Sequence, residues 1–582
     1  MLKGFLSKRC KELLYVILLI SFVLNVLGIW YTVPRCAFPD EESYITKALE
    51  VGYVTLSNGP IQGLYAYAFP KSFGPTTIYI SIPMSIYIAS TIISGEFSEI
   101  INAAPAIHHR ADFYAQLPDN ILTGLIISAR LTSAIFGIAT IFVVYLIGRE
   151  IWNEKKALLP SIILAFSVGF VNLAHQVEET IPMTFFLTLT FLFLMRYLKS
   201  EGSNGSRYFI YSCMSAGLAI ATKFNAGMIL VPLFTAYYIK KGGLKLLSKE
   251  FCVGLISMAV VFSILRIGVV LDFYRFVHYV IFAALGKFSG AFREEYGAAV
   301  STTPVWLLQV LNLANGLGLP MFLLFVSSVI FTLVKRNKIE VLLALTFVVP
   351  YTLVISMWSV APFHFIVPVL PFAALIASNL IIELNEDGRH VKPLNIFFIL
   401  VILHAAMYTL KGDLEYLHDS RDIATKWIEE NVPKGAVIET YTLSLTKIPR
   451  IPRDVELTGY YEHVKIYDDP FNITNPARYI QMEKNYTLNY MYRVCERSPD
   501  YIVVSSWDYA GLFLSKTPFK ERKIFYEKLL QGEIDSYEIV AVFGKSISET
   551  IKVDIYKKLL NSIFNPEMEK VSPTIVILEK CD

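Results

Sequence analysis

Residues 121–148, ILTGLIISARLTSAIFGIATIFVVYLIG, decide the fold, because this apolar run is long enough to cross a membrane as one helix. Further runs of this kind occur along most of the chain. They lie at residues 13–30, 157–174, 180–197, 207–222, 224–240, 250–271, 306–334, 339–357, 363–383 and 394–410. The sequence therefore predicts a polytopic α-helical membrane protein with about eleven transmembrane helices.

The composition agrees with this class and excludes others. Of 582 residues, 54% are apolar and only 17% are charged, which excludes a disordered chain and is untypical of a soluble enzyme. The net charge is +3, and no basic patch interleaved with aromatic residues is present, so nucleic acid is not expected as a partner. The six cysteines show no CxxC spacing, which argues against a zinc site or a disulfide-based scaffold.

The loops between the runs predict the orientation of the chain. Residues 1–12 are basic, and every second later loop carries lysine or arginine, which places the N-terminus and these loops in the cytoplasm. An odd number of spans then puts the C-terminus outside. A long first outer loop covers residues 32–120, and its apolar segment 74–94 is predicted as a re-entrant or interfacial helix broken by Pro75 and Pro83.

The charge pattern divides the chain into two domains. Residues 1–410 form the predicted transmembrane domain, and residues 411–582 turn polar. An amphipathic helix at 420–431 and β-branched runs at 501–504 and 574–578 predict a mixed α/β domain. We expect a multi-pass protein of the plasma membrane, with this domain and the functional site on the extracytoplasmic face.

Carboxylates gather in the first two outer loops. Asp40 and Glu41 stand in FPDEESY, directly after the first apolar run, where a partly buried carboxylate could take a proton from an attacking hydroxyl. The alternative is an acidic first turn of an interfacial helix. Glu178 and Glu179 lie in the second outer loop, and for them the alternative is an acidic helix end that is kept out of lipid.

Cations occur on the same predicted side. Arg130 and Lys223 fall inside or between apolar runs, where a charge is costly and therefore usually paired or bound to a ligand. Arg130 could be a structural partner of the acidic cluster, and Lys223 could mark a tight turn. With Lys71, His278 and Arg293 they form the set of basic residues that an anionic lipid headgroup such as a polyprenyl phosphate requires. His364, taken alone, is an interfacial residue.

The order of these features resembles the GT-C superfamily of polyprenyl-phosphate-sugar-dependent glycosyltransferases, in its protein O-mannosyltransferase and aminoarabinose transferase branch. The resemblance runs from the first helix to the C-terminal domain. It is carried by FPDEESY (38–44), SARLTSAIFGIATIFVVYLIGREIW (128–152), HQVEETIPMTFFLTLTFLF (175–193), GLAIATKFNAGMILVP (217–232), HFIVPVLPF (364–372) and DSRDIATKWIEENVPKGAVI (419–438).

The resemblance implies a role for each of these positions. Asp40 matches the acidic residue that acts as catalytic base, with Glu41 as its neighbour, and Arg130 matches an arginine that organises the site. Lys71 and Lys223 resemble positions that meet the donor phosphate. Glu178 and Glu179 resemble the acidic position of the second outer loop. Many relatives have Arg-Tyr in place of His364-Phe365, so the resemblance does not carry the contact made there over to this chain.

The resulting hypothesis is an inverting membrane glycosyltransferase. It would move a monosaccharide, with a mannose-like hexose favoured, from a polyprenyl- or dolichyl-phosphate donor to a hydroxyl of a glycan, lipid or protein acceptor. Phosphate leaves readily once cations neutralise its charge, so no cofactor is required, although the carboxylates could hold a divalent metal. The rival hypothesis is a transporter or flippase of lipid-linked saccharides, which would place polar residues near the bilayer midplane.

Overall fold

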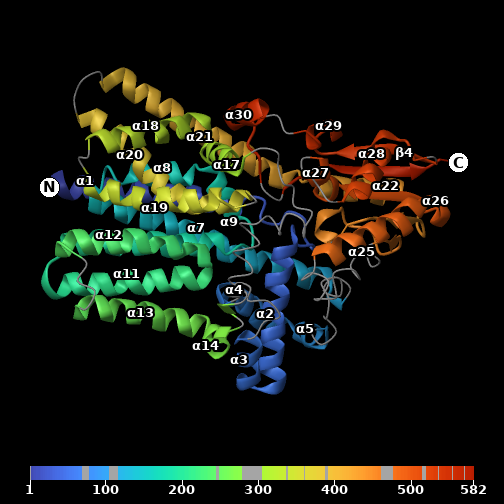
Figure 1. Cartoon of the computed structure of the whole chain (residues 1–582), viewed down its shortest axis with the longest axis horizontal. Helices are drawn as coiled ribbons and strands as arrows, with labels where there is room; N and C mark the ends of the chain where they lie inside the picture. Colours follow the sequence, from blue (N-terminus) through green and yellow to red (C-terminus); the bar gives the residue numbers. More distant parts are fainter. Residues whose placement is uncertain are drawn as a thin grey trace.

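The fold is that of a helical membrane protein with a small sheet domain at one end, and it comes from a computed structural model (Figure 1). The N-terminus lies at the free end of the helical bundle, and the C-terminus lies in the sheet domain at the opposite end. The structure describes residues 2–68, 78–103, 116–243, 248–274, 276–277, 304–335, 338–358, 361–386, 391–442, 444–459, 476–513, 519–534, 536–552, 555–568 and 571–581.

The bundle contains a helix for each predicted apolar run. Its elements are α1 (Leu2–Val26), α7 (Asp119–Ile151), α8 (Leu158–Ala165), α9 (Val168–Ala174), α10 (Thr180–Lys199), α11 (Gly202–Thr222), η2 (Phe224–Ile229), α12 (Leu230–Lys241), α13 (Lys249–Leu265), α14 (Ile267–Leu271), α17 (Val305–Leu317), α18 (Leu319–Lys335), α19 (Ile339–Ser356), η3 (Phe363–Phe365), η4 (Val367–Val369), α20 (Leu370–Glu386) and α21 (Val391–Leu417). Among the described residues, five helices are long and apolar enough to cross a membrane, or six if α17 and α18 form one span. The total of about eleven spans stays a prediction.

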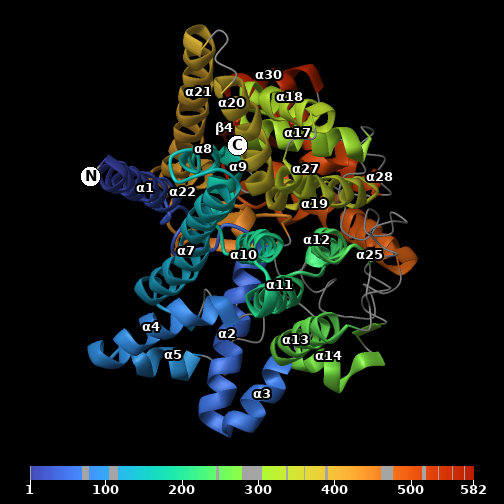
Figure 2. The same ribbon diagram turned by 90° about the vertical axis from the view of Figure 1, so that its left-hand side faces the viewer.

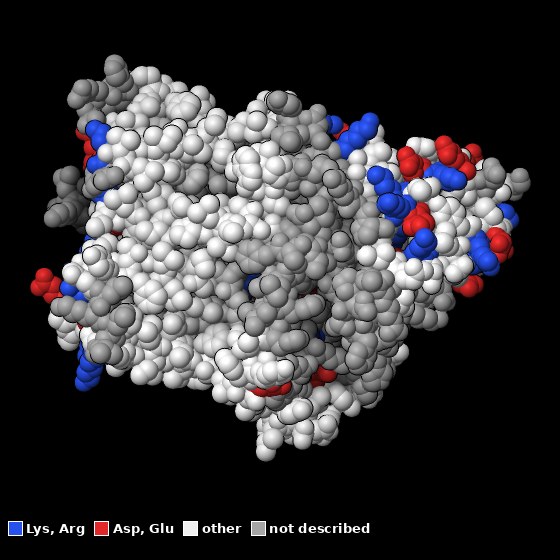
Figure 3. Space-filling view, viewed as in Figure 1, with Lys and Arg blue, Asp and Glu red and all other residues white. Residues whose placement is uncertain are grey.

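On the face shown in Figure 3, the charged side chains of the described residues gather mainly at the two ends of the molecule, with a few acidic ones at the lower middle, and the described surface of the bundle between the ends is almost free of them. The basic loops that the sequence assigns to one side meet there in space. Lys156 pairs with Glu386, Arg196 with Glu150, and Lys199 with Glu340, each pair joining two different elements at the end of the bundle that carries the N-terminus. This belt of apolar surface between two charged ends is the pattern of a membrane protein.

The first long loop folds into short helices at the other end of the bundle. These are α2 (Pro39–Asn58), α3 (Pro60–Ala68), α4 (Ile78–Ser94) and α5 (Phe97–Ala103). Figures 1 and 2 both show α2 running across the direction of the bundle helices, and Figure 2 shows the same for α4. The predicted domain boundary at residue 410 falls inside α21, which continues to Leu417.

The predicted break of the 74–94 segment at Pro83 is wrong, because α4 continues through this proline. Proline leaves the carbonyl four residues earlier without its helical donor. That carbonyl belongs to Tyr79, and it accepts a hydrogen bond from the Thr132 hydroxyl of α7 at 3.3 Å. A neighbouring helix therefore supplies the missing donor. Pro75 lies outside the described residues.

The predicted single helix at 306–334 is two helices, α17 and α18, which meet at an angle of 113°. Gly318 stands between them with φ +76°, a left-handed conformation that favours glycine, and Pro320 follows in the first turn of α18. A Gly–Leu–Pro sequence therefore ends one helix and starts the next inside an apolar run.

The C-terminal domain is built on a five-stranded mixed sheet of order β2-β1-β3-β5-β4. Its elements are α22 (Ser420–Asn431), β1 (Val437–Glu439), η5 (Leu445–Lys447), β2 (Glu456–Thr458), α25 (Pro476–Asn489), η6 (Met491–Arg493), α26 (Val494–Arg497), β3 (Tyr501–Ser505), α27 (Ser506–Phe513), α28 (Lys520–Gln531), β4 (Tyr537–Phe543), α29 (Ile547–Thr550), α30 (Ile555–Phe564) and β5 (Ile575–Lys580). Strands β1, β2 and β3 are parallel, and β5 runs antiparallel to β3 and β4. The predicted mixed α/β domain and its helix at 420–431 are confirmed.

Both faces of the central strands are covered, which explains their continuous apolar sequence. On β3, Tyr501 and Val503 pack with Ala424 and Ile428 of α22. The alternate residues Ile502 and Val504 join a second core on the opposite face, which includes residues of α28. This period of two is that of an extended strand buried on both sides.

Candidate functional site

The loop of residues 29–38, which leads from α1 to Asp40, is held to the bundle by Arg130. This arginine of α7 is fully buried, and Nη1 donates to the carbonyls of Ile29 and Tyr31 at 2.7 and 2.8 Å. Its Nε and Nη2 donate to the two carboxylate oxygens of Glu41 at 2.7 and 2.9 Å. The interpretation of Arg130 as a partner of the acidic cluster therefore agrees with the structure.

Both carboxylate oxygens of Glu41 accept hydrogen bonds from Arg130. Its Oε2 also accepts a hydrogen bond from the backbone N–H of Ala37 at 2.6 Å, and its side chain is buried. Both oxygens of this buried carboxylate therefore face the guanidinium, and neither is presented to a substrate. The geometry favours Glu41 as a residue that positions the start of α2.

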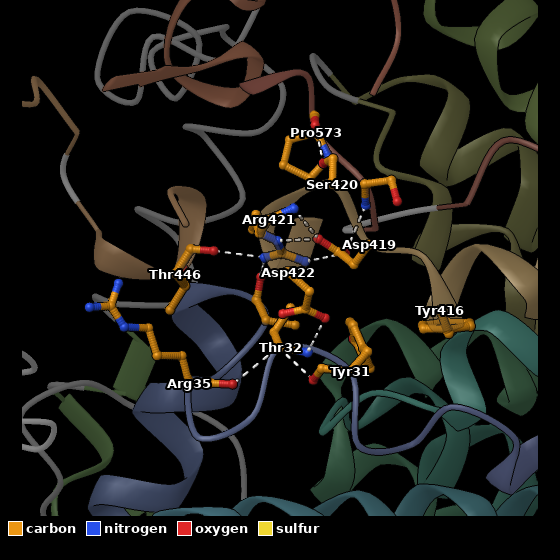
Figure 4. A network of polar contacts seen from close by, with 12 residues as sticks. Tyr31, Thr32, Arg35, Tyr416, Asp419, Ser420, Arg421, Asp422, Thr446 and Pro573 are labelled. Atoms are coloured by element: carbon orange, nitrogen blue, oxygen red, sulfur yellow. Dashed lines mark hydrogen bonds and ion pairs between the residues drawn. The ribbon is translucent and has the colours of Figure 1, made fainter. Parts of the chain in front are cut away.

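The sheet domain holds the same loop from the other side, as the close-up shows (Figure 4). Arg421 of α22 is buried, and its Nη1 donates to the carbonyls of Ala37 and Thr446 at 2.6 and 2.7 Å. Its Nε and Nη2 donate to Asp419 at 2.8 and 2.7 Å. The 29–38 loop therefore lies between two buried arginine–carboxylate pairs, one from each part of the molecule.

Asp40 follows this loop in the first turn of α2 and is exposed, in contrast to its buried neighbours Glu41 and Glu42. One turn further along α2, the Tyr44 side chain is buried. Burial and the carboxylates of Glu179, Glu178 and Asp40 raise the pKa of Tyr44 well above its usual value. Tyr44 therefore stands among the carboxylates of both loops, and the structure brings Asp40, Glu178 and Glu179 into one neighbourhood.

Lys223 is bound to the second loop. It separates α11 from η2, and its Nζ donates to Glu178 Oε1 at 2.6 Å and to Thr180 Oγ1 at 3.0 Å. The residue therefore marks a turn, as the alternative interpretation proposes, and it also pairs with Glu178, one of the predicted acidic residues. Its ammonium lies 6.0 Å from the centre of the Phe365 ring, which places η3 and the adjacent His364 at the edge of the same site.

Glu179 differs from the other carboxylates of the group because it is buried and one of its oxygens has no hydrogen-bond partner among the described residues. Only 5% of the residue is exposed, and the oxygen concerned is Oε1. Burial raises the pKa of Glu179 well above its usual value, and the nearby cations Arg266, Lys223 and Lys47 only partly oppose this. A buried acceptor beside three cations is a group that a polar ligand could satisfy.

Arg266 and Lys47 are the residues of this site that the sequence analysis missed. Arg266 stands between α13 and α14, and it donates from Nε to the Ala221 carbonyl at 2.6 Å and from Nη2 to the Thr222 carbonyl at 3.1 Å. It falls inside the apolar run 250–271, so the rule that singled out Arg130 and Lys223 applies to it equally. Lys47, on α2, carries no such signal.

The other predicted residues are not all placed. Lys71, His278 and Arg293 lie outside the described residues. Within the described part of the chain, no group of three or more His, Cys, Asp or Glu side chains is arranged to hold a metal ion. The described site thus combines exposed Asp40 with the acids Glu178 and Glu179 and the cations Lys47, Lys223 and Arg266, at the end of the bundle that meets the sheet domain.

Comparison with known proteins agrees with this arrangement. Residues 111–267 match a family described as "Dolichyl-phosphate-mannose-protein mannosyltransferase", and this segment includes Arg130, Glu178, Glu179, Lys223 and Arg266. An uncharacterised protein of Aquifex aeolicus is 31% identical over 113 residues, which cover 19% of this chain. The match covers 22% of that protein, so the chain spans about a fifth of its length.

Solved structures resemble the chain over most of its length. The oligosaccharyltransferase of Archaeoglobus fulgidus in its apo form has a TM-score of 0.50 and 13% identity, covering 98% of this chain and 88% of that chain. ArnT from Cupriavidus metallidurans bound to undecaprenyl phosphate has a TM-score of 0.48 and 12% identity, covering 97% of both chains. The family match over residues 111–267 confirms the predicted resemblance to the GT-C superfamily, and the similarity to the Archaeoglobus fulgidus structure confirms the fold.

Proposed function

We propose that the chain is a membrane glycosyltransferase that moves a monosaccharide from a polyprenyl-phosphate donor to an acceptor hydroxyl. The observation that carries the proposal is the grouping of acids and cations at one end of the bundle, within and beside a segment that matches dolichyl-phosphate-mannose-dependent transferases. A donor of that class carries both a sugar and an anionic phosphate, and the site offers groups suited to each.

The cations would bind the donor phosphate. Lys223 and Arg266 lie at the ends of α11 and α13, and Lys47 lies on α2, so all three come from the same end of the bundle. Phosphate departs with its electron pair when the glycosidic bond breaks, and fixed positive charge stabilises that departure. Lys71, His278 and Arg293 remain further proposed phosphate contacts, and His364 a contact at the edge of the site.

Asp40 would act as the general base. Of the three carboxylates at the start of α2, it is the exposed one, whereas both oxygens of Glu41 accept from Arg130. Its carboxylate would take the proton of the acceptor hydroxyl while the oxygen attacks the anomeric carbon opposite the phosphate. A single displacement of this kind inverts the anomeric centre. Mannose is the favoured sugar because of the family that residues 111–267 match.

The transporter hypothesis is less well supported. A transporter needs polar groups near the bilayer midplane that both sides can reach in turn. Here the described acids and cations gather where α2 crosses the end of the bundle, next to the folded sheet domain. That placement suits a reaction with an acceptor that approaches from the side of the sheet domain.

The test compares the wild-type protein with Asp40→Asn in nanodiscs, using radiolabelled dolichyl-phosphate mannose and membrane extract as acceptor source. Because a general base contributes about 100- to 10,000-fold, we expect Asp40→Asn to lose transfer by at least about 100-fold with donor binding unchanged. Glu50→Gln is the matched control, since Glu50 is an exposed carboxylate on the same helix.

Three outcomes would count against the proposal in different ways. Equal transfer by Asp40→Asn would remove this residue as the base. A product whose anomeric configuration is retained would exclude a single displacement. Saccharide movement across sealed vesicles without any transfer, measured with the same labelled donor, would favour the transporter.

A further inference from the structure

Helix α30 of the sheet domain has an amphipathic sequence, IYKKLLNSIF, in which apolar residues recur in pairs along one side. In a water-soluble domain such an apolar stripe is buried against the core. The helices α22 and α28 of the same domain follow this rule, because Ile428, Phe525 and Leu529 are fully buried.

In α30 the arrangement is reversed. Leu560 and Phe564, one turn apart, are 58% and 66% exposed, and Leu559 beside them is 37% exposed. The most buried described side chain of the helix is a polar one, Ser562, at 1%. Water is a poor environment for this outward apolar stripe, so its exposure indicates contact with an apolar medium or a partner.

The helix is attached to the bundle at the level of the apolar belt. It packs on α17 and α18, and Figure 1 shows it over α17, at the end of the bundle nearest the sheet domain. His404 Nε2 of α21 donates to the Ile563 carbonyl at 2.6 Å, and Lys411 donates to the side chain of Asn565. Asn315 of α17 exchanges hydrogen bonds with the backbone of Glu567, at 2.7 and 2.9 Å.

The surface next to these contacts is apolar and exposed. Along α21, on either side of His404 and Lys411, the exposed residues are Leu403 (53%), Met407 (73%), Leu410 (47%) and Leu414 (45%). The exposed stripe of α30 therefore continues the belt that the bundle presents to lipid. Lys557, exposed one turn before Leu560, forms an ion pair with Glu549 of α29, and the stem of a lysine can lie along apolar surface while its charged end stays in a polar environment.

We propose that α30 lies in the membrane interface, with Leu560 and Phe564 inserted among the lipid headgroups and upper acyl chains. The occupant of this surface is the bilayer itself, because the stripe is continuous with the apolar belt and because α30 is joined to two helices of the bundle. The sheet domain is then held at the membrane by an interfacial helix as well as by the covalent connection through α21. This inference is independent of the sugar, the acceptor and the chemistry proposed above.

The test places a nitroxide at Phe564→Cys in the full chain, reconstituted in phosphatidylcholine nanodiscs. The exposed cysteines Cys495 and Cys581 are replaced by serine, and the protein without an introduced cysteine supplies the background signal. Electron paramagnetic resonance measures how much the spin relaxation of the nitroxide is enhanced by collision with oxygen, which partitions into lipid, and by collision with a water-soluble nickel chelate. The ratio of the two enhancements reports whether the label lies in lipid or in water. Met407→Cys is the reference for a lipid-facing position, and Lys528→Cys, on α28, is the reference for water.

We expect the label at residue 564 to behave like Met407→Cys, with an oxygen-to-nickel ratio severalfold above that of Lys528→Cys. A ratio equal to that of Lys528→Cys overturns the proposal. A label shielded from both oxygen and the nickel chelate also overturns it, because a protein surface and not lipid would then cover the stripe. If Phe564→Cys does not fold, Leu560→Cys reports on the same face of the helix with the same expected result.

Discussion

Arg130 is a single residue that determines the position of a whole loop. Its guanidinium binds two backbone carbonyls and both oxygens of Glu41, and its centre lies 4.1 Å from the centre of the Tyr31 ring. An arginine suits this place better than a lysine, because only a planar fork can meet a carboxylate and two carbonyls at once.

Replacing Arg130 by alanine should destabilise the protein by about 3–5 kcal/mol, because it leaves Glu41 as an unpaired buried carboxylate. The loss is measured as a lowered midpoint of thermal unfolding in detergent. Arg149→Ala is the matched control, since Arg149 lies on the same helix but is exposed. Equal losses in both variants would show that the Glu41 pair contributes nothing specific.

Glu179 gives a prediction about pH. Its carboxyl has a raised pKa in the folded protein, so the unfolded chain releases this proton at a lower pH than the folded chain does. Folding stability therefore falls as the pH rises from the ordinary carboxyl pKa towards the raised one. We expect Glu179→Gln to remove this fall, so that its unfolding midpoint exceeds that of the wild type by an amount that grows as the pH is raised from about 5 upwards. A constant difference across this range would contradict the prediction.

At the level of elements, the sequence predicted most helices because apolar length alone identifies them. The sequence analysis missed the bend between α17 and α18, because an apolar run indicates that a segment lies in the membrane but does not show where its helix changes direction. It placed the break of α4 at Pro83 wrongly, because the donor that replaces the lost hydrogen bond belongs to Thr132 of another helix. Arg266 was missed although its signal was present, whereas Lys47 is brought to the site only by tertiary packing.

The bend at Gly318 can be tested by adding one methyl group. An alanine there would keep the φ of +76° and ψ of 141° at a cost of about 1–3 kcal/mol, and its Cβ would lie 3.4 Å from atoms of His404 and Tyr408. We therefore expect Gly318→Ala to lower the unfolding midpoint. Gly227→Ala is the control, because Gly227 has an ordinary φ and open space around its Cβ position. No effect of Gly318→Ala would indicate that the backbone relaxes without loss.

On the scale of the whole molecule, two kinds of ion pair lie at the junction of the bundle and the sheet domain. Asp419 and Arg421 form a buried pair whose arginine binds the 29–38 loop. Arg450 reaches Asp119 of α7 at 2.7 Å through a pair in which both side chains are about 40% exposed. Burial makes the first pair sensitive to the loss of one partner, and solvent screens the second.

We expect Arg421→Ala to destabilise the protein by about 3–5 kcal/mol and to lower sugar transfer, because Asp419 loses its partner and Ala37 loses its donor. Arg450→Ala should cost less than about 1 kcal/mol and leave transfer nearly unchanged. Thermal unfolding and the transfer assay measure both effects. Transfer that survives in folded Arg421→Ala would show that the loop before Asp40 does not need the sheet domain.

The junction also has a consequence for the order in which the protein matures during synthesis. The Asp419 carboxylate accepts the backbone N–H of Ser572 at 2.9 Å, and Ser420 donates to the carbonyl of Pro573. The next residues form β5, which occupies the place between β3 and β4 in the sheet. The ribosome must therefore release β5, which is made long after the 29–38 loop, before β3 and β4 can be joined in one sheet. Until β5 has been made, the loop before Asp40 has the contacts of Arg130 but lacks the support of the finished sheet, to which the Arg421 contact with Ala37 belongs.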